Sequence, residues 1–152
     1  MKYNWNWSVL FEQQYFDWIV SGTLWTIYLS LAASVIAFFL GSLIGILRTL
    51  DNKILNFIGT TYVEIFRNIP LLVQMFIWYF VFPELVPKEF GNWLKQDLPN
   101  PEFSSALFCL GTYTASRVAE QVRSGINSVS TGVGSAGYAT GLTTYQLYIY
   151  VL

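Results

Sequence analysis

Apolar residues along this chain are gathered in three stretches that polar residues separate. Residues 18–47 carry no charged side chain, and neither do residues 68–83 or 103–116. A helix of about 20 apolar residues crosses a bilayer core. The first stretch exceeds this length, and the other two approach it when the residues beside them are counted. The pattern predicts an all-α membrane protein with three transmembrane helices within residues 18–123.

The second stretch is less regular than the first. Residues 54–82 are strongly apolar but include Glu64, Arg67 and Pro70. Proline lacks the backbone N–H that a helix interior uses, so we expect a kink at Pro70, which a membrane helix tolerates when neighbours satisfy the freed carbonyl.

Polar segments flank these stretches. Residues 1–17 lack the basic run and apolar core of a cleaved signal peptide, so we expect them to be retained as an N-terminal segment. Residues 84–102 hold acids, lysines and three prolines, which predicts an aqueous loop with an interfacial helix near residues 90–94. Residues 124–152 are rich in Gly, Ser and Thr and carry no charge.

The basic residues predict the orientation. On one side of the predicted spans lie Arg48, Lys53, Arg67, Arg117 and Arg123, and on the other lie Lys2, Lys88 and Lys95. By the positive-inside rule the N-terminus and residues 84–102 are extracytoplasmic, and residues 124–152 are cytoplasmic.

Composition excludes several classes of function. Only 11% of residues are charged, against about 25% in a soluble domain. The net charge of -1 offers no basic surface to a nucleic acid. The chain has no histidine and a single cysteine, Cys109, which we interpret as a packing residue. No metal site and no Ser/His/Asp triad can be assembled, so we do not expect an enzyme.

Small residues recur every fourth position in the first stretch. Small side chains let a second helix approach closely, so we interpret this face as a helix-packing surface; a face that lines a transport path is the alternative. The residues are Ala33, Ala37, Gly41 and Gly45.

Polar side chains beside the second and third stretches are candidates for a substrate pathway. Glu64 and Arg67 are three residues apart, as are Arg117 and Glu120, so each pair can share a helix face. The pairs either neutralise each other at the interface or offer positive potential to a solute carboxylate. The tentative pathway residues are Arg67, Gln74, Arg117 and Glu120.

A glycine-rich run near the end of the chain invites a nucleotide-binding interpretation. Residues 132–137 match the GxGxxG pattern, but no strand is predicted before them and no acid follows Glu120. The chain also lacks a GxxxxGK[ST] motif. We therefore predict neither nucleotide binding nor ATPase chemistry on this chain.

Longer motifs carry a family resemblance over essentially all of the chain. Residues 62–74 (YVEIFRNIPLLVQ) resemble the second-span signature of permease subunits of the histidine/glutamate/glutamine ABC uptake family. Residues 119–129 and 141–152 resemble the region around that family's cytoplasmic coupling loop, the EAA motif. The Trp5-Asn-Trp7 opening and residues 80–85 are most similar to the glutamate/aspartate branch.

The resemblance implies a multi-pass permease of the type I ABC importer fold in the bacterial inner membrane. Its partners would be a periplasmic substrate-binding protein, a second permease subunit and a pair of ATPase subunits. The chain would carry no cofactor, because ATP and Mg²⁺ would bind the ATPase. Its coupling loop would be a short helix, a break at Gly141 and a second helix from Thr143 or Thr144, with Ser135, Ala136, Gly137, Gly141 and Leu142 at the ATPase.

Two departures from the family pattern leave an alternative open. Ser135-Ala136-Gly137 stands where the family has Glu-Ala-Ala, and the family continues after Leu152 with a proline and two further spans. The second departure leads us to expect a chain truncated before the last two helices, either as a fragment or as the product of a truncated gene. The alternative to transport is a membrane fragment with a structural or regulatory packing role.

Overall fold

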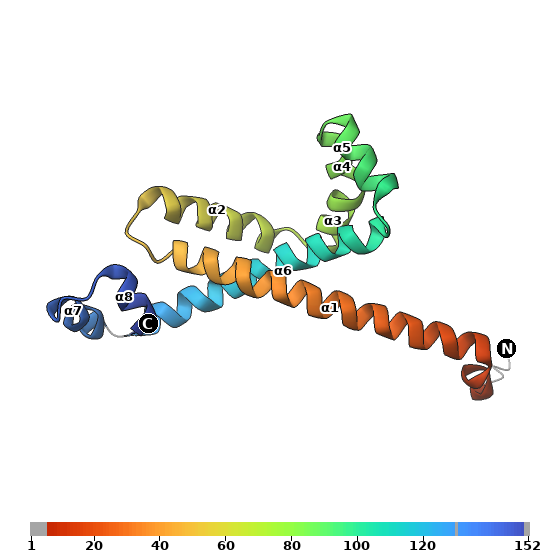
Figure 1. Ribbon diagram of the computed structural model, residues 1–152, viewed down its shortest axis with the longest axis horizontal. Coiled ribbons are helices and arrows are strands. Elements are labelled where there is room, and N and C mark those ends of the chain that lie inside the picture. Colours follow the sequence, from red (N-terminus) through yellow and green to blue (C-terminus); the bar gives the residue numbers. More distant parts are fainter. Residues whose placement is uncertain (1–5, 130, 151–152) are drawn as a thin grey trace.

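The computed structural model describes residues 6–129 and 131–150, and in these residues the chain folds into helices without a strand (Figure 1). A short 3₁₀ helix, η1 (Trp7–Phe11), precedes the long helix α1 (Gln13–Leu47). The 35 residues of α1 rise about 1.5 Å each, so the helix is longer than the roughly 30 Å hydrocarbon core of a bilayer.

A sharp break divides the second apolar stretch. Helix α2 (Lys53–Asn68) begins at Asn52, whose side chain accepts hydrogen bonds from the backbone N–H groups of Ile54 and Leu55. It ends before Pro70, and α3 (Leu71–Phe76) begins directly after that proline. Ile69 is extended, as a residue before proline prefers. The two halves are bent by 102°, so the predicted kink is confirmed as a complete break.

The segment predicted as a loop with one helix near residues 90–94 is helical there and over most of its length. Helix α3 continues through the π-helical η2 (Ile77–Val81) into α4 (Phe82–Leu85), followed by α5 (Lys88–Asn92) and the π-helical η3 (Trp93–Asp97). We call residues 82–97 the helical lobe.

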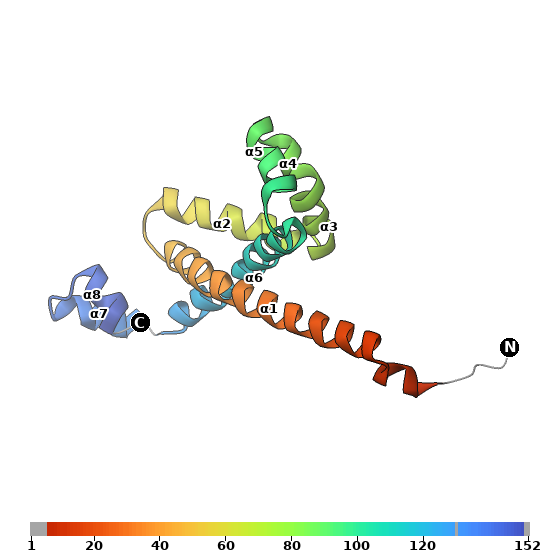
Figure 2. The same ribbon diagram turned by 45° about the vertical axis from the view of Figure 1, so that its right-hand side comes forward.

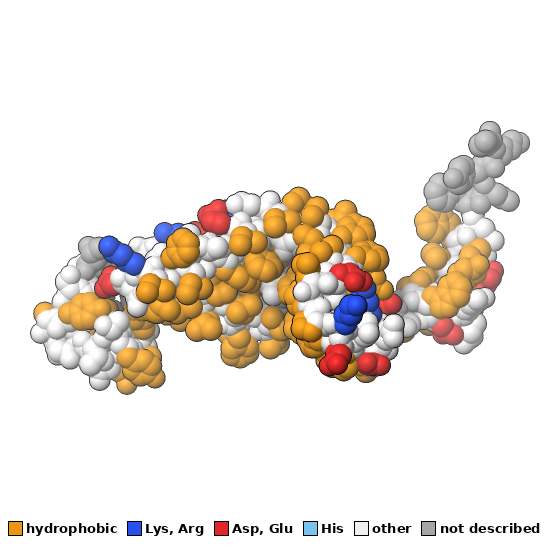
Figure 3. Space-filling model, turned by 90° about the horizontal axis from the view of Figure 1, so that it is seen from above, with side chains coloured by type: hydrophobic (Ala, Val, Ile, Leu, Met, Phe, Trp, Pro, Cys, Tyr) orange, Lys and Arg blue, Asp and Glu red, His pale blue; other side chains and the backbone are white. Residues whose placement is uncertain are grey.

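Two contacts within the lobe explain why it folds. A Cβ on Gly91 would lie 2.2 Å from the carbonyl oxygen of Pro83, so glycine allows the two segments to touch. Lys95 forms an ion pair with Glu84. The lobe projects from the rest of the chain, and charged side chains gather at its end, whereas hydrophobic ones cover the middle of the molecule (Figures 1 and 3).

Helix α6 (Pro101–Ser128) packs against α1 (Figures 1 and 2). A Cβ on Gly41 would lie 2.6 Å from the Cβ of Val118, and one on Gly45 would lie 2.7 Å from the Cβ of Val122. Ala33 and Ala37 on the same face are buried. The structure therefore places all four small residues of the predicted packing face in the buried side of α1.

The helices that are long and apolar enough to span a membrane do not match the three predicted spans one for one. Helix α1 is long and apolar enough to cross a membrane. Helix α2 and residues Leu71–Leu85 meet that criterion only together, as a bent pair. Among the described residues no other helix meets it, because the second half of α6 is rich in charged and polar residues. A three-span topology stays a prediction.

Many large apolar side chains are exposed on the surface of the chain. Large side chains of α1 are exposed, such as Trp18 at 61% and Phe39 at 69%. The core that does form is small and consists of Ile44, Val63 and Ala119, with Leu40 and Tyr62 against it. Exposed apolar surface of this extent marks contact with lipid or with other helices.

Candidate functional site: a helical hairpin and a buried ion pair

The end of the chain forms a helical hairpin. Helix α7 (Thr131–Ala139) is followed by α8 (Thr144–Tyr150), and Gly141 between them has φ +87°. The N–H of Leu142 donates to the carbonyl of Gly137 at 3.2 Å, which closes the end of α7. The predicted break at Gly141 is confirmed, because only glycine adopts this backbone conformation without strain.

Helix α8 begins with a reciprocal cap. The hydroxyl of Thr143 accepts from the backbone N–H of Gln146 at 3.3 Å, and the side-chain oxygen of Gln146 accepts from the backbone N–H of Thr143 at 2.9 Å. This exchange satisfies two N–H groups that a helix start leaves unpaired. The expected helix start near Thr143 is confirmed.

The two helices of the hairpin pack through Gly137. A Cβ at this position would lie 2.4 Å from Cδ1 of Leu147, a side chain that is only 4% exposed. Ser135 and Ala136 are on the surface of α7, and Leu142 is half-buried. Of the residues expected at an ATPase, Ser135 and Ala136 are therefore accessible, whereas Gly137 holds the hairpin together.

The hairpin contacts the rest of the chain at the end of α1. The hydroxyl oxygens of Thr49 and Tyr148 are 2.8 Å apart, although the residues are 99 positions apart in the sequence. Sequence reasoning missed this contact, because Tyr148 was one of several aromatic residues in an apolar run. The sequence around either residue contains no pattern that identifies the other as its partner.

A buried ion pair joins α1, α2 and α6. Arg48 is only 6% exposed, and its Nη1 donates to Oε2 of Glu120 at 2.6 Å. Arg123 contacts the other oxygen of Glu120 at 3.4 Å. The stem of Arg48 lies over Gly59, where a Cβ would be 2.7 Å from Cγ of the arginine. Its carbonyl accepts from the side-chain amide of Asn56 at 2.6 Å.

The candidate pathway residues are not brought together as one site. Glu120 pairs with Arg48, which entered the sequence analysis only as one of the basic residues that predict the orientation. Arg117 is exposed and lies over the ring of Tyr113, with its guanidinium carbon 4.9 Å from the ring centroid. Arg67 is exposed on α2, where its neighbour Glu64 accepts from the side-chain amide of Asn68 at 2.9 Å.

Gln74 has a different environment from the one we expected. Its side chain is 4% exposed, and Nε2 donates to the carbonyl of Phe66 at 2.7 Å and to that of Ile69 at 2.8 Å. These carbonyls lie at the end of α2, where the break at Pro70 removes their helical partners. The donors of Gln74 thus cap α2 in this structure rather than face a solute.

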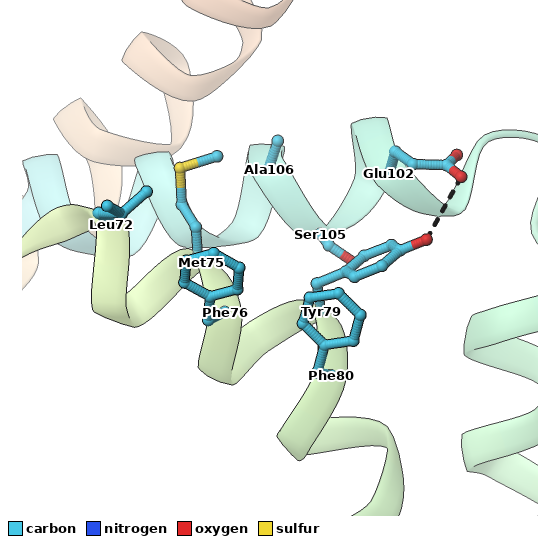
Figure 4. A pocket seen from close by; sticks show the side chains of 8 residues that line it. All are labelled: Leu72, Met75, Phe76, Tyr79, Phe80, Glu102, Ser105 and Ala106. Carbon is cyan, nitrogen blue, oxygen red and sulfur yellow. Dashed lines mark hydrogen bonds between the residues drawn. The ribbon is translucent and has the colours of Figure 1, made fainter.

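An apolar groove of about 350 Å³ lies between α3, η2 and the start of α6 (Figure 4). Tyr79 crosses it, and its hydroxyl donates to Glu102 at 3.4 Å. The lining residues are Leu72, Met75, Phe76, Tyr79, Phe80, Glu102, Ser105 and Ala106. Nowhere in the described part of the chain do three or more Cys, Asp or Glu side chains gather as metal ligands would.

The chain has helices with exposed apolar faces, a break inside one apolar stretch and an uncharged hairpin at one end. These features define a helical membrane protein. Residues 37–152 match the family described as binding-protein-dependent transport system inner membrane component. The chain belongs to this family, which comprises transport components rather than enzymes. The resemblance stated from residues 62–74, 119–129 and 141–152 is therefore confirmed.

Individual relatives agree with this family. Over 160 residues the chain is 49% identical to the glutamate/aspartate import permease protein GltJ of Escherichia coli (strain K12), with 100% of this chain and 65% of that protein covered. It is 26% identical over 144 residues to the glutamate/aspartate import permease protein GltK of Escherichia coli O6:H1, with 95% and 62% covered. The chain thus spans just under two thirds of the length of these relatives.

A solved structure shares the fold. The chain matches the crystal structure of an amino acid ABC transporter with histidines at a TM-score of 0.75 and 24% identity. The match covers 97% of this chain and 63% of the transporter chain. The overall helical fold of this chain is therefore shared with a chain of that transporter.

Proposed function

We propose that this chain acts as a permease subunit of an ATP-driven importer in the bacterial inner membrane. The importer passes glutamate or aspartate from a periplasmic binding protein into the cytoplasm. The observation that carries this proposal is the 49% identity to GltJ over the whole chain. The second permease subunit would be a homologue, as the additional similarity to GltK suggests. ATP and Mg²⁺ would bind separate ATPase subunits.

The α7–α8 hairpin is the part of the chain that fits contact with an ATPase. Ser135 and Ala136 are accessible on α7, and the cap at Thr143 with the packing of Gly137 makes the hairpin a compact unit. A compact element can be displaced as a rigid body, and in this way the hairpin would pass closure of the nucleotide site of the ATPase to the membrane helices. The basic residues favour placing this hairpin in the cytoplasm.

Competition for uptake tests the substrate. The importer is reconstituted in liposomes with its binding protein and ATPase, and uptake of labelled glutamate is measured against unlabelled competitors. We expect aspartate to compete strongly and glutamine and histidine weakly. Stronger competition by glutamine or histidine than by aspartate would overturn the acidic substrate.

Crosslinking tests the coupling role of the hairpin. A cysteine at Ala136 in the Cys109→Ser background is treated with a thiol crosslinker in the assembled importer, and we expect the ATPase subunit to be captured. The matched control is Gln96→Cys, which lies exposed in the helical lobe. Equal capture from both positions, or from neither in an importer with active ATP-driven uptake, argues that α7 does not contact the ATPase.

A further inference from the structure

The hydrogen bond between the hairpin and the end of α1 joins Tyr148 and Thr49, and its donor and acceptor can be assigned. The hydroxyl of Thr49 donates to the carbonyl of Ile46 at 2.8 Å. A threonine hydroxyl has one hydrogen, so its oxygen is left to accept from Tyr148 at 2.8 Å. The hydroxyl of Tyr148 is therefore the donor in this hydrogen bond, and that of Thr49 is the acceptor.

Thr49 is adjacent to a residue that contacts both α2 and α6. Arg48, the preceding residue, pairs with Glu120 of α6 at 2.6 Å and accepts from Asn56 of α2 at 2.6 Å. A force applied to Thr49 acts next to the residue that joins α1, α2 and α6. Figures 1 and 2 both show the hairpin beside this end of the helices.

The hairpin itself is built to move as one piece. Leu147 is buried against Gly137, so α8 cannot shift along α7 without opening this contact. Tyr148 follows Leu147 directly and carries the hydroxyl that bonds to Thr49. A displacement of the exposed face of α7 is thereby passed to Tyr148.

We propose that Tyr148 and Thr49 are positioning residues that connect the hairpin to the helical bundle. Through their hydrogen bond, displacement of α7 and α8 reaches α1 and then, through Arg48, α2 and α6. This inference rests on the proposed coupling role of the hairpin. It adds the specific contact by which the movement passes from the hairpin to the membrane helices.

The test compares uptake with ATP hydrolysis in the reconstituted importer. For Tyr148→Phe we expect the glutamate transported per ATP hydrolysed to fall about fivefold, the effect of one net hydrogen bond on an equilibrium. Thr49→Val should give a similar fall, and the double variant should be no worse than either single one, because all three remove the same bond. Thr49→Ser keeps the acceptor and should retain coupling.

A matched control and a structural measurement make the test specific. Tyr145→Phe removes a hydroxyl from the same helix at a residue that is 75% exposed, and it should leave the ratio unchanged. Hydrogen exchange of residues 144–150 should become faster in Tyr148→Phe, which verifies that the contact was lost. Faster exchange with an unchanged ratio of uptake to hydrolysis would overturn the proposal, as would unchanged exchange. If the unmodified importer shows no ATP-driven uptake, the proposed function itself fails.

Discussion

At the scale of single residues, Arg48 has the most demanding environment in the described part of the chain. It is buried, it shares Glu120 with Arg123, and its Nε has no hydrogen-bond partner. Removing one member of a buried pair leaves the other charge without full compensation, whereas replacing both by apolar residues can be nearly neutral. Single and double substitutions of Arg48 and Glu120 should therefore differ in their effect on stability.

We expect Arg48→Met to lower the free energy of unfolding by about 2 kcal/mol, less than for a fully buried pair because Glu120 remains 35% exposed. The double variant Arg48→Met, Glu120→Met should recover part of that loss. Thermal unfolding of the detergent-solubilised protein measures both. A double variant that loses the sum of the two single losses would show that the residues act independently.

A substitution of Gln74 distinguishes a structural role of this side chain from a role in binding the solute. Gln74→Leu removes both donors to the carbonyls at the end of α2, which should cost about 2 kcal/mol of stability. We expect the order in which amino acids compete for uptake to stay the same. The control Gln121→Leu changes an exposed glutamine of α6 and should have little effect. A changed order of competition with unchanged stability would place Gln74 at the solute instead.

At the scale of elements, the contact of α1 with α6 depends on small residues at fixed positions. In Gly41→Ala the added methyl would lie 2.7 Å from the carbonyl oxygen of Ala115, a backbone atom that cannot move aside cheaply. Overpacking of this kind costs about 1–3 kcal/mol. The same helix contains Gly22, whose Cβ position has no atom within 4 Å.

We therefore expect opposite outcomes from two alanine substitutions in one helix. Gly41→Ala should lower the unfolding temperature, whereas Gly22→Ala should leave it unchanged or raise it, because alanine favours the helix by up to about 1 kcal/mol. Thermal unfolding in the same detergent provides the comparison. A similar loss in both variants would mean that helix α1 is not held by close packing at Gly41.

At the scale of the whole molecule, the helical lobe and the α7–α8 hairpin lie far apart, toward opposite ends of the helical bundle (Figure 1). The lobe carries acids and lysines, and the hairpin follows the half of α6 that contains Arg117 and Arg123. Basic residues are enriched near cytoplasmic ends of membrane helices. This distribution favours the lobe outside the cell membrane and the hairpin inside.

Cysteine labelling in intact spheroplasts tests this orientation. With Cys109 replaced by serine, a membrane-impermeant maleimide should label Gln96→Cys from outside and should label Ala136→Cys only after the membrane is opened. Both positions are exposed, so access to the reagent differs only through the membrane. Labelling of position 136 in closed cells would reverse the proposed topology.

The sequence by itself determined the features that depend on local chemistry. An uncharged apolar run specifies α1, Pro70 interrupts the second apolar stretch because proline cannot donate, and Gly141 divides the hairpin because it adopts a positive φ. The motifs at residues 62–74, 119–129 and 141–152 together indicated the family, and the family match over residues 37–152 confirms it.

Only the tertiary structure decided which distant residues meet. Arg48 and Glu120 are 72 positions apart, and Thr49 and Tyr148 are 99 positions apart. Spacing along a helix predicts neighbours three or four residues away but carries no information about the helix packed opposite. For the same reason the sequence predicted only one short helix within residues 84–102, since the close approach of Gly91 to Pro83, which packs the helices of the lobe together, leaves no periodic pattern in the sequence.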